Sequence, residues 1–202
     1  MSFMSLRATV GSVAISKRTT KFIRDCFGRI NRHSQLFVAM LLAMTQPYAV
    51  WADAGTNNFQ LTCTAFEDNA VIPKKYTCDG QDVNPPLVFK SIPANAKSLA
   101  LTVSDPDAPM GTWSHWVVYN IPPNTLEIKE DTNPGKEVLN DFGKNAYGGP
   151  CPPSGKTHHY IFHAYALDCL LNIKDGPTIN DVEKSLQGHI IAQSLLVGTY
   201  QK

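Results

Sequence analysis

Three stretches decide how this chain folds and what it can bind: SDPDAP at residues 104–109, GTWSHW at 111–116 and YGGPCPPSGKTHHY at 147–160. They contain carboxylates, histidines, a tyrosine and a loop rich in Gly and Pro. They lie far apart along the chain, so their side chains can meet only if a fold gathers them. Two imidazoles and a carboxylate would then form a small polar pocket. Such a pocket suits an anionic oxygen ligand, a metal ion or acid–base chemistry.

The segments around these stretches predict a β-rich, mostly antiparallel domain. Apolar runs of strand length are found at residues 98–103, 115–120 and 159–167. Shorter strands are expected at residues 59–66, 71–76 and 87–89. The connecting segments are rich in Gly, Pro, Asp and Asn, which favour turns.

The C-terminal segment has a different pattern. Thr178 and Asp181 resemble a capping box, and Val182 and Leu186 follow at helical spacing. We therefore expect a short helix that ends or breaks near Gly188. Residues 190–200 could be a second helix, a strand, or one passing into the other.

Residues 1–54 are predicted to be a leader. Seven basic and two acidic residues give this segment a net charge of +5. The apolar run LFVAMLLAM at residues 36–44 is too short to span a bilayer, which needs roughly 20 residues. Ala52-Asp53-Ala54 forms an A-x-A cleavage site. This pattern predicts a signal peptide and an exported protein, periplasmic or secreted, with no stable membrane span after cleavage.

The basic region is unusually long for a secretory leader, which a start codon assigned too far upstream would explain. Two alternatives to a secretory leader remain open. A mitochondrial transit peptide would also explain the long basic region, because the first 33 residues are rich in Arg and poor in acidic residues. An uncleaved helix lying on the membrane is the second alternative.

Residues 55–202 have the size of one domain with a sizeable core. This part contains eleven Lys, no Arg and fifteen acidic residues, for a net charge of −4. A nucleic-acid-binding domain usually shows a basic stripe and Arg side chains that can bind phosphates or guanine. The sequence therefore argues against a nucleic-acid partner.

Four cysteines lie outside the leader: Cys63, Cys78, Cys151 and Cys169. Their spacing matches no zinc ribbon and no CxxC motif. An oxidising compartment permits disulfides, with three possible full connectivities. Free buried thiols are an equal alternative, because a domain of this size does not need cross-links to fold.

Asp105 and His115 are the first candidate ligand-binding residues. The apolar run at residues 98–103 ends beside Asp105, and His115 begins the next core strand. Asp107 is expected to have only a local role in the Asp-Pro turn. A lone strand histidine is usually structural, but here a second candidate histidine follows the Gly- and Pro-rich loop.

Alternation along a strand separates the histidines of residues 158–163. Adjacent strand residues face opposite sides, so only one of His158 and His159 should reach the pocket. Tyr160 shares a face with His158, whereas His163 shares the face of His159. Gly148, Gly149 and Pro150 precede this strand, and the backbone N–H groups of the two glycines could contact a ligand.

At these residues the chain closely resembles the phosphatidylethanolamine-binding protein family, in its bacterial Raf-kinase-inhibitor-like branch. The resemblance covers essentially all of residues 57–202. It rests on the strings SDPDAP, GTWSHWVVYNIP, YGGPCPP, YALD and QGHIIAQSLLVGTYQK. The family implies two antiparallel sheets, a short C-terminal helical element and a small pocket for phosphate, acetate or a phospholipid headgroup.

The resemblance also assigns residues to that pocket. Asp105, His115, His158 and Tyr160 match the family's motif positions, with Gly149 and Pro150 in the adjoining loop. The place of a second histidine found in eukaryotic members is taken by Ser114. Family members are reported as kinase or protease inhibitors, which implies a possible protein partner.

The resemblance bears on the cysteines as well. Cys63 and Cys169 stand where small or polar residues are expected in cytosolic relatives, which suggests a disulfide between them. Cys78 and Cys151 look like family features and are expected to remain thiols. The competing pairing joins Cys78 to Cys151 and would rigidify the rim of the pocket.

The leading interpretation is a non-enzymatic binding protein that needs no cofactor and no metal ion. Its ligand would be a small anion, either phosphate or a headgroup. The alternative is a hydrolase that uses the same Asp and His side chains with a metal ion or as acid and base. Ser114 and Cys151 lie near the motifs, but the sequence contains no recognisable nucleophile–base pair.

Overall fold

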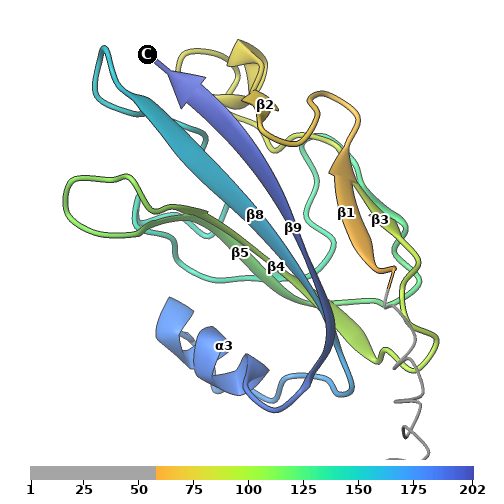
Figure 1. Cartoon of the computed structure of the whole chain (residues 1–202). Helices are drawn as coiled ribbons and strands as arrows, with labels where there is room; N and C mark the ends of the chain where they lie inside the picture. The colour runs from red at the N-terminus through yellow and green to blue at the C-terminus, as the bar shows by residue number, and fades with distance from the viewer. Residues whose placement is uncertain (1–57) are drawn as a thin grey trace, which may run out of the picture. The chain divides into compact units, whose positions relative to one another are not determined.

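The computed structural model describes residues 58–202, which form two β-sheets and one short α-helix (Figure 1). The larger sheet has the strand order β2-β9-β8-β4-β5-β7, and the smaller sheet has the order β1-β3-β6. Among these described strands only β2 and β9 pair in parallel. The predicted mainly-β fold with two antiparallel sheets and a short C-terminal helix is confirmed.

The bounds of the elements are as follows. The smaller sheet contains β1 (Gln60–Cys63), β3 (Leu87–Lys90) and β6 (Glu127–Ile128). The larger sheet contains β2 (Ala70–Val71), β4 (Ser98–Asp105), β5 (Trp113–Ile121), β7 (Lys136–Glu137), β8 (Thr157–Leu167) and β9 (Ile190–Gln201). A 3-10 turn covers Lys74–Tyr76, and the helix α3 covers Ile179–Leu186.

The predicted leader lies outside the described residues, as do its cleavage site and Cys26. No helix within residues 58–202 is long and apolar enough to cross a membrane.

Two apolar cores cover the two faces of the larger sheet. Alternation along β4 places Leu99, Leu101 and Val103 in the core between the two sheets, and Ala100 in the core beneath α3. On the α3 side, Val182 and Leu186 from the helix pack against the sheet. Figure 1 shows α3 on one side of the large sheet and the β1–β3 pair on the other.

The short helix begins as the sequence predicts. Thr178 accepts a hydrogen bond from the amide of Asp181, and the Asp181 carboxylate accepts one from the amide of Thr178, which completes a capping box. Gly188 follows the helix with a φ of 82°, a conformation that glycine adopts at little cost. Residues 190–201, which the sequence left open, form the long strand β9 beside β8.

One short element differs from the prediction. Residues 71–76 were expected to form a strand, but β2 contains only Ala70–Val71, and Lys74–Tyr76 form the 3-10 turn. Pro73 lies between them and has no N–H to continue the strand pairing.

A β-bulge in β5 changes which side chains face the core between the sheets. Val103 pairs with Trp116 and Ser104 pairs with Ser114, so His115 is an extra residue without a partner on β4. Simple alternation would place His115 and Trp116 on opposite faces. A bulge disrupts alternation locally and re-aims side chains. Trp116 accordingly packs in the core between the sheets, while His115 lines a cavity shared with Asp105.

The cysteine pairing corrects the prediction. Cys78 and Cys151 form a disulfide with a Cα–Cα distance of 5.4 Å, and Cys63 and Cys169 are free. Cys63 lies on β1 of the smaller sheet, against the core between the sheets, whereas Cys169 packs with the core beneath α3. The expected Cys63–Cys169 bridge required neighbouring strands, and the larger sheet lies between these two cores.

We expect Leu101→Ala to lower the free energy of unfolding by about 2–5 kcal/mol, because it leaves a cavity in a closely packed core. Leu101 is 0% exposed, whereas Leu195 on β9 is 56% exposed. Leu195→Ala is therefore the matched control, with an expected change within about 0.5 kcal/mol. Urea denaturation measures both changes. Equal effects of the two substitutions would contradict the assigned core.

Peptide mapping without reduction is expected to recover residues 78 and 151 in one cross-linked peptide, with Cys63 and Cys169 alkylated. The bridge spans a sequence separation of 73. In the chain-entropy model a loop of this length stabilises the fold by roughly 4 kcal/mol. The double variant Cys78→Ser/Cys151→Ser should therefore unfold at lower urea concentration. Recovery of a Cys63–Cys169 peptide would contradict the structure.

Candidate functional site

A buried carboxylate–imidazole pair forms the floor of the candidate site. Asp105 ends β4 and His158 lies near the start of β8, and their antiparallel pairing brings these two positions to the same end of the sheet. The His158 Nδ1 donates to Asp105 Oδ2 over 2.7 Å. Their side chains are only 4% and 6% exposed, for His158 and Asp105 respectively. Asp105 Oδ1 also accepts from the amide of Asp107 over 2.8 Å.

The bulged His115 supplies the second imidazole. Its Nδ1 donates to the carbonyl oxygen of Gly148 over 2.6 Å, and its ring packs edge-on against Tyr160 with 5.1 Å between centroids. Burial lowers the pKa of His115, although the Gly148 carbonyl and the Asp105 carboxylate act in the opposite direction. His115 is therefore predominantly neutral at neutral pH. In both His115 and His158 the proton bound at Nδ1 leaves Nε2 for another partner.

One buried donor in the cavity wall has no partner. Within residues 58–202, Trp113 Nε1 and the Tyr160 hydroxyl are the buried side-chain nitrogen and oxygen atoms without a close hydrogen-bond partner. Tyr160 nevertheless interacts with Asp105: burial, and after it the charge and hydrogen bonding of Asp105, raises the pKa of Tyr160, so the hydroxyl keeps its proton. An unpaired buried donor is costly. The Trp113 N–H therefore indicates room for an acceptor that belongs to a ligand.

A cavity of about 240 Å³ is lined by these groups except Tyr160, which packs against His115. Its polar residues are Asp105, His115 and His158, and Trp113 contributes to the wall. The other lining residues are mostly apolar: Ala108, Pro109, Met110, Phe142, Cys151, Pro152 and Pro153. Met110 is 92% exposed and Phe142 is 39% exposed, so apolar side chains are partly open to solvent around a polar floor.

The predicted loop residues Gly149 and Pro150 do not line this cavity. The Gly149 amide donates to Asp82 Oδ1 over 2.7 Å, and the Pro150 carbonyl accepts from the amide of Cys78 over 3.1 Å. A Cβ at Gly149 would lie 2.5 Å from the Tyr76 carbonyl oxygen, so the close approach of two backbones requires glycine here. The Gly149 amide was expected to contact the ligand. In the structure it instead joins its own loop to the loop that carries Asp82.

Asn140 holds the loop that carries Phe142. Its side chain donates to the carbonyls of His115 and Ala146 and accepts from the amides of Phe142 and Lys144. A buried amide with all of these partners fixes the path of the loop across the bulge. Phe142 then packs on Gly148, where a Cβ would lie 2.5 Å from the ring.

The Cys78–Cys151 disulfide ties the cavity wall to a neighbouring loop. Cys151 lines the cavity directly, and its disulfide partner lies in the turn that follows Lys74–Tyr76. A bridge between Cys78 and Cys151 was the competing pairing, and it is expected to make the rim of the cavity more rigid.

Strand alternation separates the remaining histidines from the cavity, as predicted. His159 is exposed and donates from its amide and its Nδ1 to Asp107, which keeps Asp107 out of the site. His163 lies on the same side as His159, and its Nδ1 is hydrogen-bonded to the Tyr165 hydroxyl. The structure therefore brings together Asp105, His115, His158 and Tyr160 of the predicted site residues.

Sequence reasoning missed the apolar wall of the cavity. Trp113 and Phe142 contact each other edge-on, with centroids 5.5 Å apart, and both line the cavity. The available signal was a single aromatic residue, Phe142, in an otherwise polar loop. Met110 beside the SDPDAP turn offered a similar signal.

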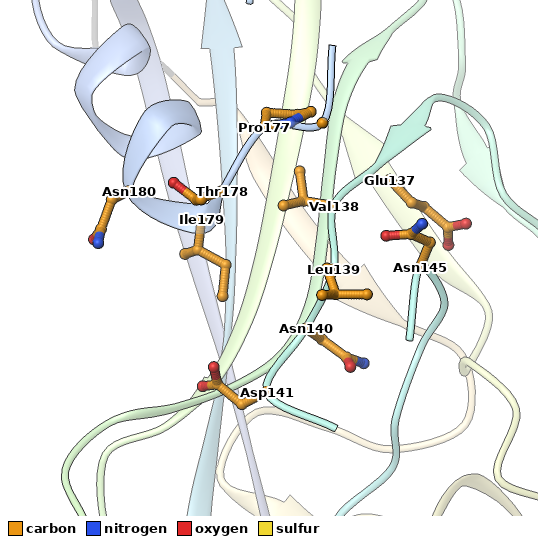
Figure 2. A pocket seen from close by; sticks show the side chains of 11 residues that line it. Glu137, Val138, Leu139, Asn140, Asp141, Asn145, Pro177, Thr178, Ile179 and Asn180 are labelled. Atoms are coloured by element: carbon orange, nitrogen blue, oxygen red, sulfur yellow. The ribbon is translucent and has the colours of Figure 1, made fainter. Parts of the chain in front are cut away.

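A larger groove of about 660 Å³ lies between residues 137–141 and the start of α3. Figure 2 shows Val138 and Leu139 from one segment and Thr178 and Ile179 from the other around this groove. Its lining contains no histidine. Glu137 accepts from the Trp116 indole and Asp141 accepts from the amide of Ser114, so both carboxylates already have partners. The smaller cavity is therefore the stronger functional candidate.

Known proteins with similar sequences support one family. The family model described as phosphatidylethanolamine-binding protein matches residues 62–201. A UPF0098 protein of Pyrococcus horikoshii is 48% identical over 149 residues, which cover 69% of this chain and 75% of that protein. A UPF0098 protein of Methanothermobacter thermautotrophicus is 42% identical over 145 residues, which cover 68% of this chain and 95% of that protein.

Solved structures agree with the sequence matches. A phosphatidylethanolamine-binding protein homologue from Chlamydia trachomatis has a TM-score of 0.69 and 43% identity, covering 73% of this chain and 99% of that one. Escherichia coli YbcL, a member of the mammalian PEBP family, has a TM-score of 0.66 and 30% identity, covering 71% and 98%. The fold, the motif residues and these matches together show that this chain belongs to the phosphatidylethanolamine-binding protein family.

Proposed function

We propose that the protein binds a small anionic oxygen ligand in the cavity of Asp105, His115 and His158, and that it does so without catalysing a reaction. One observation carries the proposal: two buried imidazoles whose Nδ1 atoms are already bonded and the unpaired indole N–H of Trp113 line a single small cavity. Each of these groups can donate a hydrogen bond to an oxygen anion once both imidazoles are protonated.

Asp105 prepares the site for a negative charge although it is itself negative. It is paired with His158, so a protonated His158 leaves the pair neutral rather than anionic. Protonation of His115 then supplies the net positive charge that balances the ligand. Because burial lowers the pKa of His115, the charge develops most readily when an anion is present to stabilise it.

The size of the cavity limits the ligand class. Pockets for drug-sized molecules usually measure roughly 300–1,000 Å³, and this cavity measures about 240 Å³. It suits a phosphate group or a phosphoester headgroup rather than a lipid with its acyl chains. The apolar side chains of Met110 and Phe142 can contact the organic part of such an ester.

Two features favour binding over the hydrolase alternative. Cys151 is in a disulfide and cannot act as a thiolate nucleophile. Ser114 lines a different cavity, with Thr102 and Glu183, because adjacent strand residues face opposite sides. The side chains that the sequence offered as nucleophiles are thus not directed at the acid–base groups.

Export of the protein is a further part of the proposal, and the Cys78–Cys151 disulfide supports it. Disulfides persist mainly in oxidising compartments such as the periplasm or the extracellular space. Modulation of a kinase or a protease stays a prediction.

His158→Ala is expected to weaken the binding of inorganic phosphate by at least about tenfold, because a hydrogen bond to a charged group contributes roughly 1.5–3 kcal/mol. Trp113→Phe removes the indole N–H together with part of the ring and should weaken binding by a smaller factor. Calorimetric titration measures both, with circular dichroism to check folding. His159→Ala is the matched control, because His159 lies outside the cavity.

Three ligands distinguish the sources of the phosphate group in that titration: inorganic phosphate, glycerophosphoethanolamine and short-chain phosphatidylethanolamine. We expect the first two to bind and the acyl chains to add little affinity. Unchanged phosphate binding in both His158→Ala and Trp113→Phe would overturn the site.

Anion affinity is expected to rise as the pH falls from about 7.5 to 5.5, because His115 must gain a proton to donate from Nε2. Its pKa lies below the usual 6.5, so the increase should continue below that pH. Sulfate is the suitable probe, since it does not titrate in this range. His115→Gln should flatten the dependence and His159→Gln should leave it unchanged. An equal dependence in wild type and His115→Gln would contradict a direct imidazole contact.

A further inference from the structure

A second cluster of ligand-type side chains lies at the end of the large sheet opposite the anion cavity. Asp168 and Cys169 directly follow β8, and His189 directly precedes β9. The strand pairing brings Leu167 opposite Ile190, which places these two segments side by side. His158 lies near the start of β8, so most of the length of that strand separates the two sites.

The geometry of the cluster is close to that of a metal site. The potential ligand atoms of Asp168, Cys169 and His189 all lie within 4.8 Å of one another. In a tetrahedral zinc site the metal–sulfur and metal–nitrogen distances are about 2.3 and 2.0 Å, which puts neighbouring ligand atoms roughly 3–4 Å apart. Small side-chain rotations would therefore bring the three ligands onto one ion.

The imidazole and the carboxylate already lie close to ligand spacing. His189 Nδ1 donates to Asp168 Oδ1 over 2.8 Å. An ion bound to these two atoms would take the place of the proton between them, and the neutral ring would then carry its proton at Nε2. Asp168 and His189 are about half exposed, with side-chain values of 49% and 48%, so an ion can reach them from solvent.

The backbone that carries the ligands is held in place. The Asp168 amide donates to the His189 carbonyl over 3.0 Å, and the Ser98 hydroxyl donates to the Cys169 carbonyl over 2.6 Å. The His189 amide donates to the carbonyl of Leu186 at the end of α3 over 3.1 Å. An ion would therefore join the end of α3 to the sheet without having to order a loose segment.

We propose that Asp168, Cys169 and His189 form a binding site for a thiophilic divalent cation of the zinc class. A thiolate, an imidazole and a carboxylate are ligands that zinc accepts, and a thiolate disfavours magnesium and calcium. Three protein ligands leave the fourth position to water. Binding deprotonates the thiol, and the proton passes to solvent.

Cobalt(II) titration of the full, untagged chain tests this site, because a cobalt–thiolate bond gives a charge-transfer absorption in the near ultraviolet. We expect the band in the wild type and its displacement by Zn²⁺. Cys169→Ser should abolish the band, and His189→Asn should weaken Co²⁺ binding by at least about tenfold.

Two matched controls remove the other cysteines outside the disulfide: Cys63, which is free, and Cys26, which lies outside the described residues. Cys63→Ser and Cys26→Ser should both keep the band and the affinity for Co²⁺. Absence of the band from the wild type, its persistence in Cys169→Ser, or equal affinity in His189→Asn would each overturn the proposal. Circular dichroism without metal checks that every variant is folded.

Discussion

The buried bond between Asp105 and His158 is the interaction on which the candidate site depends. A carboxylate with a 6% exposed side chain is costly unless a partner stabilises it. His158 is that partner, over 2.7 Å. Removing one member of a buried ion pair typically costs about 3–5 kcal/mol, because the other is left uncompensated. The pairing also fixes which imidazole nitrogen faces the cavity, so one contact serves both stability and binding.

The bulge at His115 is the second constraint, because it allows two strands to supply groups to one cavity. A regular β5 would place His115 and Trp116 on opposite faces. With the bulge, Trp116 fills the core while His115 faces Asp105. The extra residue leaves a carbonyl free, and Asn140 and the Gly148 amide both donate to it. The irregular strand and the loop over it thus stabilise each other.

Patterns among neighbouring residues in the sequence correctly predicted the features that depend on neighbouring residues. Alternation correctly placed His158 and Tyr160 on one buried face and His159 on the other, and the capping box correctly marked the start of α3. The family resemblance added the grouping of Asp105 with the histidines.

The failures concern contacts between distant loops. The Gly149 amide bonds to Asp82, 67 residues away, and no local pattern encodes that partner. The resemblance suggested a disulfide between Cys63 and Cys169, whereas the two cysteines pack in separate cores. Phe142 lines the cavity only because Asn140 fixes the loop, a contact that spacing alone does not reveal.

The central claim is that an anion binds directly to Nε2 of both buried imidazoles. Nitrogen-15 NMR of the imidazole rings, recorded with and without phosphate, tests it most directly. We predict that His115 and His158 carry a proton at Nδ1 in the free protein, and that bound phosphate brings a second proton to Nε2 of both rings and shifts both Nε2 resonances. Phosphate binding that leaves both Nε2 resonances unchanged would contradict it.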